Sequence, residues 1–228
     1  AQQLAVPRIP HLSMAVIESY SATDSSVLFP RIARLVQAGG VLAVPTETYY
    51  GLGVNPFDGA AVARLLFIKG RPDGKPILIL IGDQAQLPDL VTEVSPAAQV
   101  LMEAFWPGPL TLVFSASARL SKSVTAGTGT VGVRHTSHAA LAELLRHTGP
   151  LTGTSANRSG EPPVQTAAEV ERTLGAMVDV IVDGGPTQGG LPSTVLSVCD
   201  GVRMIREGPI DRAMIQQALV ARGFHLKP

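Results

Sequence analysis

The sequence predicts an α/β fold, a single domain in which a twisted mixed sheet is flanked by helices. Short apolar runs alternate with segments of helical periodicity along the 228 residues, without internal repeats. The runs 41–44 and 77–81 are apolar at every position, as is typical of strands covered on both faces. Cations recur in loops rich in Gly, Pro and Ser at the expected strand ends, which predicts a positively lined cleft there.

Each helix is expected from a polar N-cap, an apolar stripe and a stop signal. Ser25 or Ser26 caps the first helix and Gly39 ends it, while Thr166 and Glu169 form a capping box for a later one. In chain order the expected helices span about 25–38, 58–69, 95–105, 138–147, 166–175 and 211–223.

The strands are expected from short apolar or alternating runs bounded by turn residues. In chain order they span about 14–17, 41–44, 77–81, 110–114, 130–134, 151–154, 178–182, 194–198 and 202–205. The segments 45–53 (PTETYYGLG) and 183–192 (DGGPTQGGLP) are expected to be loops at the ends of strands, where open α/β sheets bind their ligands.

Composition limits the classes of function. With 45% hydrophobic and 16% charged residues the chain is globular, and its formal net charge of zero disfavours broad binding of nucleic acid. The one cysteine, Cys199, excludes an internal disulfide and a CxxC zinc site, and we expect it to be a buried structural thiol. Because the sequence has no apolar run of membrane-spanning length and no signal-peptide pattern, we expect a cytoplasmic protein without a membrane partner.

Two glycine-rich motifs resemble nucleotide-binding fingerprints without fitting them. GTGTVG at 127–132 matches GxGxxG, but 130–134 alternates like a strand and the next helix waits for a cap at Thr136 or Ser137. The loop 69–75 is one residue too short between its glycines for a P-loop, and proline follows its last lysine. Neither motif therefore predicts backbone binding of phosphate.

Several catalytic chemistries are also excluded. Ser155 is not a nucleophile elbow, because Asn157 replaces the second glycine of GxSxG. The five histidines form no HExxH motif, and we expect His135 to pack or to lie at the surface. Paired carboxylates for sugar chemistry are not evident. We expect Trp106 to be a packing residue, not an adenine stacker.

The expected strand-end loops carry hydroxyls and cations but few carboxylates, with Glu47 the main exception, and such a lining suits a polyanion. The candidates are Thr46, Thr48, Tyr50, Lys69, Arg71, Lys75, Arg134, Ser155, Asn157, Arg158, Ser193, Thr194 and Arg206. If a carboxylate attacks a nucleotide phosphate, both reactants are anionic and fixed cations must offset their repulsion. We expect Lys69, Arg71, Lys75 and Arg206 to do so, with Mg²⁺ carried by the nucleotide because no DxD-like cage is visible.

Seven motifs, in order, resemble one known family. PTETYYGLG, KGRPDGKP, FWPGPLTLVF, VGVRH, TGTSANRSGEPP, PSTVL and REGPI lie between about residues 28 and 210 and look like the threonylcarbamoyl-AMP synthase (YrdC-like) family. The resemblance implies an α/β fold with a large, positively lined cleft and a reaction of L-threonine, bicarbonate and ATP. The products are threonylcarbamoyl-AMP and pyrophosphate, and a downstream threonylcarbamoyl transferase machinery modifies adenosine 37 of tRNA.

The resemblance also implies roles for individual residues, with Lys69 and Arg71 as the catalytic pair. Lys69, Arg71, Lys75, Ser155, Asn157 and Arg206 are similar to the family's ATP contacts. Thr46, Tyr50, Ser193, Thr194 and Arg134 are similar to its threonine and bicarbonate contacts. Of the adjacent Tyr49 and Tyr50, we expect Tyr50 to face the ligand. The chain, 1–228, resembles the short single-domain form, and its strand ILILI lacks a histidine of the longer members.

Two alternatives stay open. The first is a double-stranded RNA or tRNA-binding module using the same basic cleft, although zero net charge and 4% aromatic residues argue against it. If the protein is the synthase, we expect tRNA to be bound indirectly or weakly. The second is a carbamoyl-adenylate enzyme of the hydrogenase-maturation type, whose zinc fingers one cysteine cannot supply.

Overall fold

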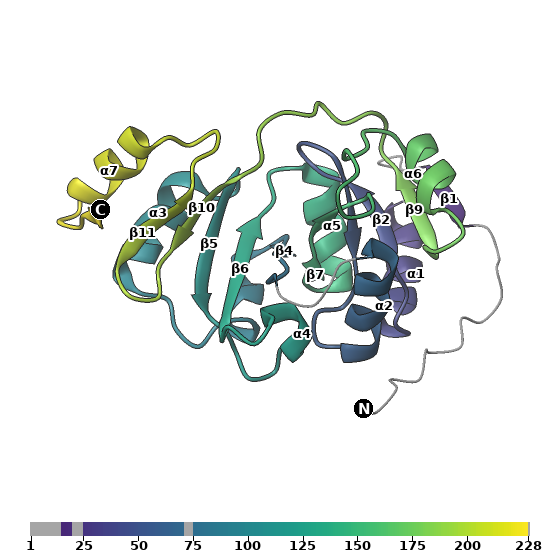
Figure 1. Ribbon diagram of the computed structural model, residues 1–228, viewed down its shortest axis with the longest axis horizontal. Helices are drawn as coiled ribbons and strands as arrows, with labels where there is room; N and C mark the ends of the chain where they lie inside the picture. Colours follow the sequence, from purple (N-terminus) through teal and green to yellow (C-terminus); the bar gives the residue numbers. More distant parts are fainter. Residues whose placement is uncertain (1–14, 20–24, 71–74, 228) are drawn as a thin grey trace.

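The strands of the protein form two mixed sheets, where the sequence predicted one. The computed structural model describes residues 15–19, 25–70 and 75–227. The five-stranded sheet has the order β1 (Val16–Ser19), β9 (Val180–Asp183), β2 (Leu42–Pro45), β3 (Tyr50–Gly53), β8 (Thr154–Ser155). The seven-stranded sheet has the order β12 (Leu226–Lys227), β11 (Val202–Arg206), β10 (Thr194–Ser197), β5 (Leu110–Ser115), β6 (Thr130–His135), β4 (Ile79–Ile81), β7 (Leu151–Thr152). Figure 1 shows the two sheets side by side.

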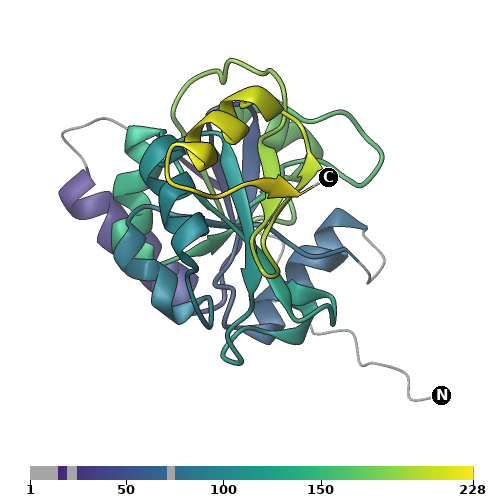
Figure 2. The ribbon, with the colours of Figure 1, turned by 90° about the vertical axis from the view of Figure 1, so that its left-hand side faces the viewer.

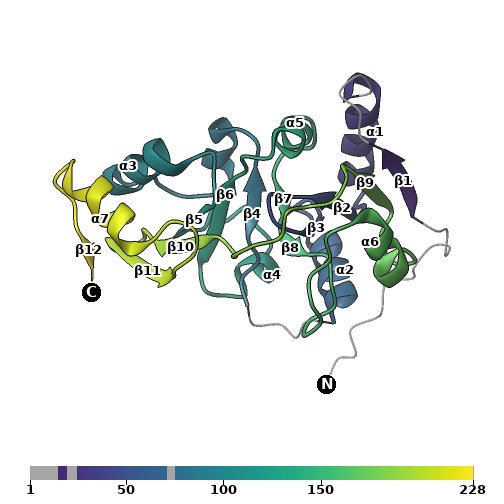
Figure 3. The same ribbon diagram turned by 90° about the horizontal axis from the view of Figure 1, so that it is seen from above.

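Helices cover both sides of these strands. They are α1 (Ser25–Gln37), α2 (Gly59–Lys69), α3 (Pro96–Phe105), α4 (Lys122–Thr125), α5 (Ala139–Thr148), α6 (Ala167–Leu174) and α7 (Arg212–Val220), with a 3₁₀ helix η1 (Gln84–Asp89). Seen from above in Figure 3, α1, α3 and α5 lie on one side and α2, α4 and α6 on the other. Figure 2 looks onto the end formed by α7 and β10 to β12, drawn in yellow. The expected α/β class with helices flanking mixed sheets is confirmed.

Most of the expected helix caps are confirmed. The side chains of Asp58, Ser95 and Asp211 accept hydrogen bonds from the first turns of α2, α3 and α7. Thr166 and Glu169 form the expected capping box of α6. The expected cap of α5 was wrong, since His138 Nδ1 accepts the bond from the Leu141 amide. None of the helices in the described residues combines the length and apolarity needed to cross a membrane.

Two strand predictions need correction. The segment 45–53 was expected to be a loop, but its second half is β3, which pairs with both β2 and β8. The expected strand 151–154 divides at Gly153, so that β7 belongs to one sheet and β8 to the other. A Cβ on Gly153 would lie 2.7 Å from Leu80 Cγ, so the chain passes between the sheets where only a glycine fits.

The segment 184–193 carries the chain from one sheet to the other. It leaves β9, which lies between β1 and β2 in the five-stranded sheet, and enters β10 in the seven-stranded sheet, arching over the molecule in Figure 1. Figure 3 shows the same segment crossing between the two halves. The loop expected at 183–192 therefore has a defined path that brings Ser193 to the start of β10.

Candidate active site

Lys69 connects two segments that the sequence predicted to bind ligand, the loop that begins at Lys69 itself and the loop that contains Ser155 and Asn157. It is the last residue of α2 and only 4% exposed, and Gly70, with φ of 56°, turns the chain away after it. Lys69 Nζ donates to Ser155 O at 2.6 Å and to Asn157 Oδ1 at 3.1 Å. Asn157 Nδ2 donates to Glu161 O at 2.6 Å, which fixes the amide with its oxygen toward the lysine. Three predicted ATP contacts thus meet across 86 positions of sequence.

Arg206 and Ser193 form a second group at the far end of β11. The Nε and Nη2 atoms of Arg206 donate to Ser193 O at 3.1 and 2.8 Å. Ser193 Oγ lies 2.9 Å from Thr111 Oγ1, a buried polar residue of β5. The parallel pairing of β10 with β5 brings these residues together. The arginine predicted to bind ATP and the serine predicted to bind threonine are therefore neighbours.

Arg134 and Glu47 form a third group. Arg134, on β6, is 7% exposed and donates through Nη2 to Glu47 Oε2 at 3.1 Å. Burial would raise the pKa of Glu47, but the charge of Arg134 and hydrogen bonds from Thr136 and Ser137 lower it below its usual value. Burial and the charge of Arg134 lower the pKa of Arg206.

A series of contacts connects the Lys69 group with Glu47 and Arg134. Ser155, which accepts from Lys69, pairs with Gly51 of β3. A Cβ on Gly51 would lie 3.4 Å from Thr46 Cγ2, and Glu47 follows Thr46. A pocket of about 340 Å³ opens beside this line, lined by Pro45, Thr46, Glu47, Ser137, His138 and 184–188. The structure thus brings five of the predicted site residues into one continuous arrangement, namely Thr46, Lys69, Arg134, Ser155 and Asn157.

Tyr50 lies beneath one wall of this pocket. Its side chain is fully buried, and its hydroxyl donates to Gly185 O at 2.9 Å and accepts from the Gly184 amide at 3.3 Å. Burial raises the pKa of Tyr50 to about 12, so the hydroxyl stays a donor at neutral pH. The expected ligand contact of Tyr50 stays a prediction; the observed contact is with the segment that lines the pocket.

The remaining predicted residues lie around this arrangement. Thr194 is fully buried and its hydroxyl bonds both the carbonyl and the amide of Ile210, which anchors the REGPI segment. Lys75 is exposed, and Arg71 falls outside the described residues. Trp106 is a packing residue as expected, since Nε1 donates to Leu110 O at 2.8 Å.

His135 and Cys199 lie apart from the cations. His135, next to Arg134 on β6, points to the opposite face of the strand and lies edge-on to Trp106 at 6.3 Å between ring centroids. Burial lowers the pKa of His135, so it packs as a neutral ring. Cys199 is half-buried, where we expected it buried, and its thiol contacts Val113 O at 3.4 Å.

Some residues that the structure places at the site were not predicted from the sequence. Glu47 was noted as an exception and not selected, although an isolated carboxylate among cationic loops indicates a charge partner. Thr111 was hidden in the apolar run of β5, where a polar residue at a buried position was the available signal. Thr136 and Ser137 were read as helix caps, and they instead donate to Glu47 at 2.7 Å each.

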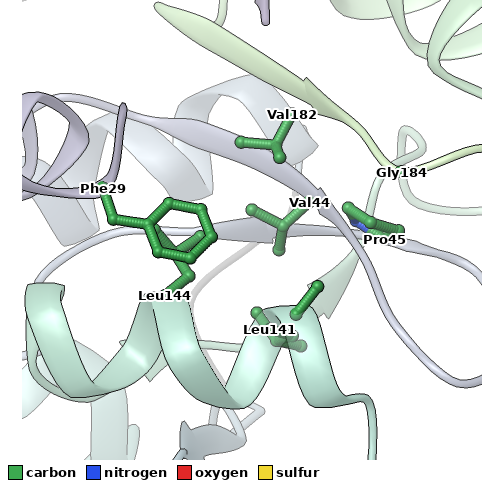
Figure 4. A pocket seen from close by; sticks show the side chains of 8 residues that line it. Phe29, Val44, Pro45, Leu141, Leu144, Val182 and Gly184 are labelled. Atoms are coloured by element: carbon green, nitrogen blue, oxygen red, sulfur yellow. The ribbon is translucent and has the colours of Figure 1, made fainter. Parts of the chain in front are cut away.

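A second, apolar cavity lies behind Pro45 and Gly184. Figure 4 shows Phe29, Val44, Leu141, Leu144 and Val182 around it, contributed by α1, β2, α5 and β9. Its volume of about 10 Å³ is at the lower limit for one water molecule, and its lining offers no polar partner. It is a packing space of the core and not a ligand site.

We expect Tyr50→Phe to lower the free energy of unfolding by about 1 kcal/mol, because the hydroxyl of the fully buried Tyr50 side chain no longer bonds the Gly184 amide and the Gly185 carbonyl. Tyr49→Phe is the matched control, since its hydroxyl makes one exposed 3.4 Å contact with Gly190 O. That control should change stability by less than about 0.5 kcal/mol. Urea unfolding measures both variants, and equal losses would contradict an anchoring role for Tyr50.

Comparisons with known proteins identify the family of the chain. The Sua5/YciO/YrdC family model, described as "Telomere recombination", matches residues 34–208. The threonylcarbamoyl-AMP synthase of Bacillus subtilis is 39% identical over 90% of this chain and 59% of its own length. That of Thiobacillus denitrificans is 42% identical over 75% of this chain and 92% of its own.

A solved structure extends the likeness to the fold. The crystal structure of Pyrococcus abyssi Sua5 complexed with L-threonine superposes with a TM-score of 0.83 at 32% identity, over 95% of this chain and 63% of that one. The chain therefore spans about 60% of the length of the Bacillus and Pyrococcus relatives. One family model accounts for most of the sequence, and the chain belongs to the Sua5/YciO/YrdC family.

Proposed function

We propose that the protein is a threonylcarbamoyl-AMP synthase, a nucleotidyltransferase that joins L-threonine, bicarbonate and ATP and releases pyrophosphate. The observation that carries this proposal is a pair of buried cations, Lys69 held by Ser155 and Asn157 and Arg134 held by Glu47, together with Arg206 held by Ser193. Relatives with this activity in their names match most of the chain.

The reaction balances as two transfers. The threonine amine attacks the carbon of bicarbonate and water leaves, which gives N-carboxythreonine. A carbamate oxygen of this intermediate then attacks the α-phosphorus of ATP, a new P–O bond forms, and the bond to pyrophosphate breaks. Because the attacking group is already anionic, the protein has to neutralise and position charge and needs no strong base.

The residues divide this work by their places in the fold. Lys69 holds a phosphate oxygen at the end of α2 as a point charge, while Ser155 and Asn157 keep its ammonium in position. Arg206, at the end of β11, is held by its hydrogen bond to Ser193 O and is proposed to face the same reactants. Arg71 and Lys75 are proposed to add charge on the phosphate side, as the sequence motif suggests. Thr46, Tyr50 and Thr194 stay proposed contacts or supports of the threonine side.

Mg²⁺ is proposed to enter with ATP, bound through its phosphates. Within the described residues, no group of three or more His, Cys, Asp or Glu side chains lies close enough to hold a metal ion on its own. The product is proposed to pass to a threonylcarbamoyl transferase machinery that acts on adenosine 37 of tRNA, so that contact with tRNA is indirect or weak. A cytoplasmic location stays a prediction from the sequence.

The test is release of pyrophosphate from purified protein supplied with ATP, Mg²⁺, L-threonine and labelled bicarbonate. We expect pyrophosphate and label in a nucleotide product only when every component is present, and less product when serine replaces threonine. Pyrophosphate release that occurs equally without threonine or without bicarbonate would contradict the proposal. So would absent turnover combined with tRNA binding that weakens steeply with salt, which indicates the RNA-binding alternative.

A further inference from the structure

One carboxylate oxygen of Glu47 accepts hydrogen bonds from the turn after β6, and the other accepts a hydrogen bond from Arg134. Its Oε1 accepts from Thr136 Oγ1 and from the Ser137 amide, both at 2.7 Å. These donors are neutral and belong to the turn that follows β6. Its Oε2 accepts from Arg134 Nη2 at 3.1 Å. The turn therefore sets the direction in which the carboxylate presents its charge to the arginine.

The electrostatics of the site require such a partner. Arg134 is 7% exposed, whereas Arg206 is exposed, and the charge of Arg134 contributes to the lowered pKa of Arg206. A guanidinium charge withdrawn from water is costly unless an anion lies nearby. Glu47 supplies that anion before any reactant arrives. Its lowered pKa keeps it ionised at neutral pH and makes it a poor proton acceptor.

The contact with Glu47 leaves donors of Arg134 for a reactant. Among the described residues, the hydrogen bond that engages its guanidinium runs through Nη2, and the buried Nε has no hydrogen-bond partner there. A guanidinium gripped at one edge keeps its planar fork in a fixed orientation. The remaining edge matches the oxygens of a small carboxylate.

We propose that Glu47 is a positioning residue, which holds the Arg134 guanidinium in the orientation that binds the oxygens of a small carboxylate reactant. This inference rests on the proposed function, in which threonine and bicarbonate both offer such oxygens. Glu47 itself touches Arg134, Thr136 and Ser137, and it acts on the reactant through the arginine.

The kinetic test is Glu47→Gln, which keeps an acceptor for Thr136 and Ser137 and removes the charge. We expect the KM for threonine or for bicarbonate to rise about tenfold, while kcat and the KM for ATP stay within about twofold. The reactant whose KM rises, threonine or bicarbonate, is the one that Arg134 binds. Glu47→Asp, which retains the charge on a shorter side chain, should recover part of the loss.

A double-mutant cycle separates this role from a structural one. In an Arg134→Gln background, adding Glu47→Gln should raise the same KM less than about twofold, because the arginine through which Glu47 acts is already absent. A tenfold cost in both backgrounds would overturn the proposal. Glu143→Gln is the matched control, since Glu143 pairs with Arg146 at 2.6 Å on the exposed face of α5 and should change neither KM.

Nuclear magnetic resonance of the Arg134 Nε–H group tests the same idea without turnover. The signal, assigned by its loss in Arg134→Gln, should be sharp in the unsubstituted protein and in Glu143→Gln, and broadened in Glu47→Gln. An unchanged signal in Glu47→Gln would overturn the positioning role. If the protein releases no pyrophosphate, the proposed function fails, while this signal still decides whether Glu47 orients Arg134.

Discussion

Lys69→Ala is expected to lower kcat/KM for ATP-dependent pyrophosphate release at least about a thousandfold, because a buried cation aimed at developing phosphate charge is lost. The ammonium is buried and held by Ser155 O and Asn157 Oδ1, so alanine leaves these acceptors without their cation. Removal of the donor should also cost about 1–2 kcal/mol of unfolding free energy. Single-turnover release of labelled pyrophosphate measures the first effect and urea unfolding the second.

Two further variants serve as controls for Lys69→Ala. Lys122→Ala removes an exposed lysine of α4 and should leave turnover and stability unchanged. Lys69→Arg keeps the charge but adds a planar fork where a point charge fits, and it should recover only part of the activity. Turnover of Lys69→Ala equal to that of the unsubstituted protein would remove Lys69 from the mechanism.

Gly208→Ala is expected to lower the free energy of unfolding by about 3 kcal/mol and to weaken catalysis as well. A Cβ at this position would lie 2.4 Å from Pro192 O and 2.6 Å from Thr194 N, so backbone has to move. The displaced segment contains Ser193, whose carbonyl accepts both bonds from Arg206. The added methyl group therefore disturbs the fold and the arginine together.

Gly59→Ala is the matched control for this substitution. Gly59 opens α2, and a Cβ there meets Ser121 Oγ at an ordinary 3.6 Å. Alanine favours the helix over glycine by up to about 1 kcal/mol, so this variant should be neutral or slightly more stable. Urea midpoints and pyrophosphate release are measured for both variants. An unchanged urea midpoint for Gly208→Ala would contradict the prediction, because it would mean that the turn accommodates the added methyl group without loss of stability.

The helices were predicted well because their signals are local. A polar cap and a terminating glycine act within one turn, so Asp58, Ser95, Thr166 and Asp211 could be identified as caps without knowing what they pack against. β3 was missed because two of its four residues, Gly51 and Gly53, carry no strand signal. Its glycines reflect close packing against β8 and Leu151, which is not visible in the local pattern.

The candidate site was predicted as a set of loops and not as a geometry. Residue types identified Lys69, Ser155, Asn157, Ser193 and Arg206, and the structure brings them into groups. Glu47 was undervalued because a carboxylate within a loop looks the same whether it faces solvent or an arginine 87 positions away. Tyr50 was expected at the ligand, and its hydroxyl reaches Gly185, 135 positions away.

The sequence by itself determined the α/β class, the helix caps and the residue types of the candidate site. These depend on interactions between neighbours along the chain, whose energies are set by spacing. Only the tertiary structure decided that the strands divide between two sheets at Gly153 and that Glu47 faces Arg134. Those outcomes depend on which distant surfaces fit together, because packing and burial of charge are properties of the assembled core.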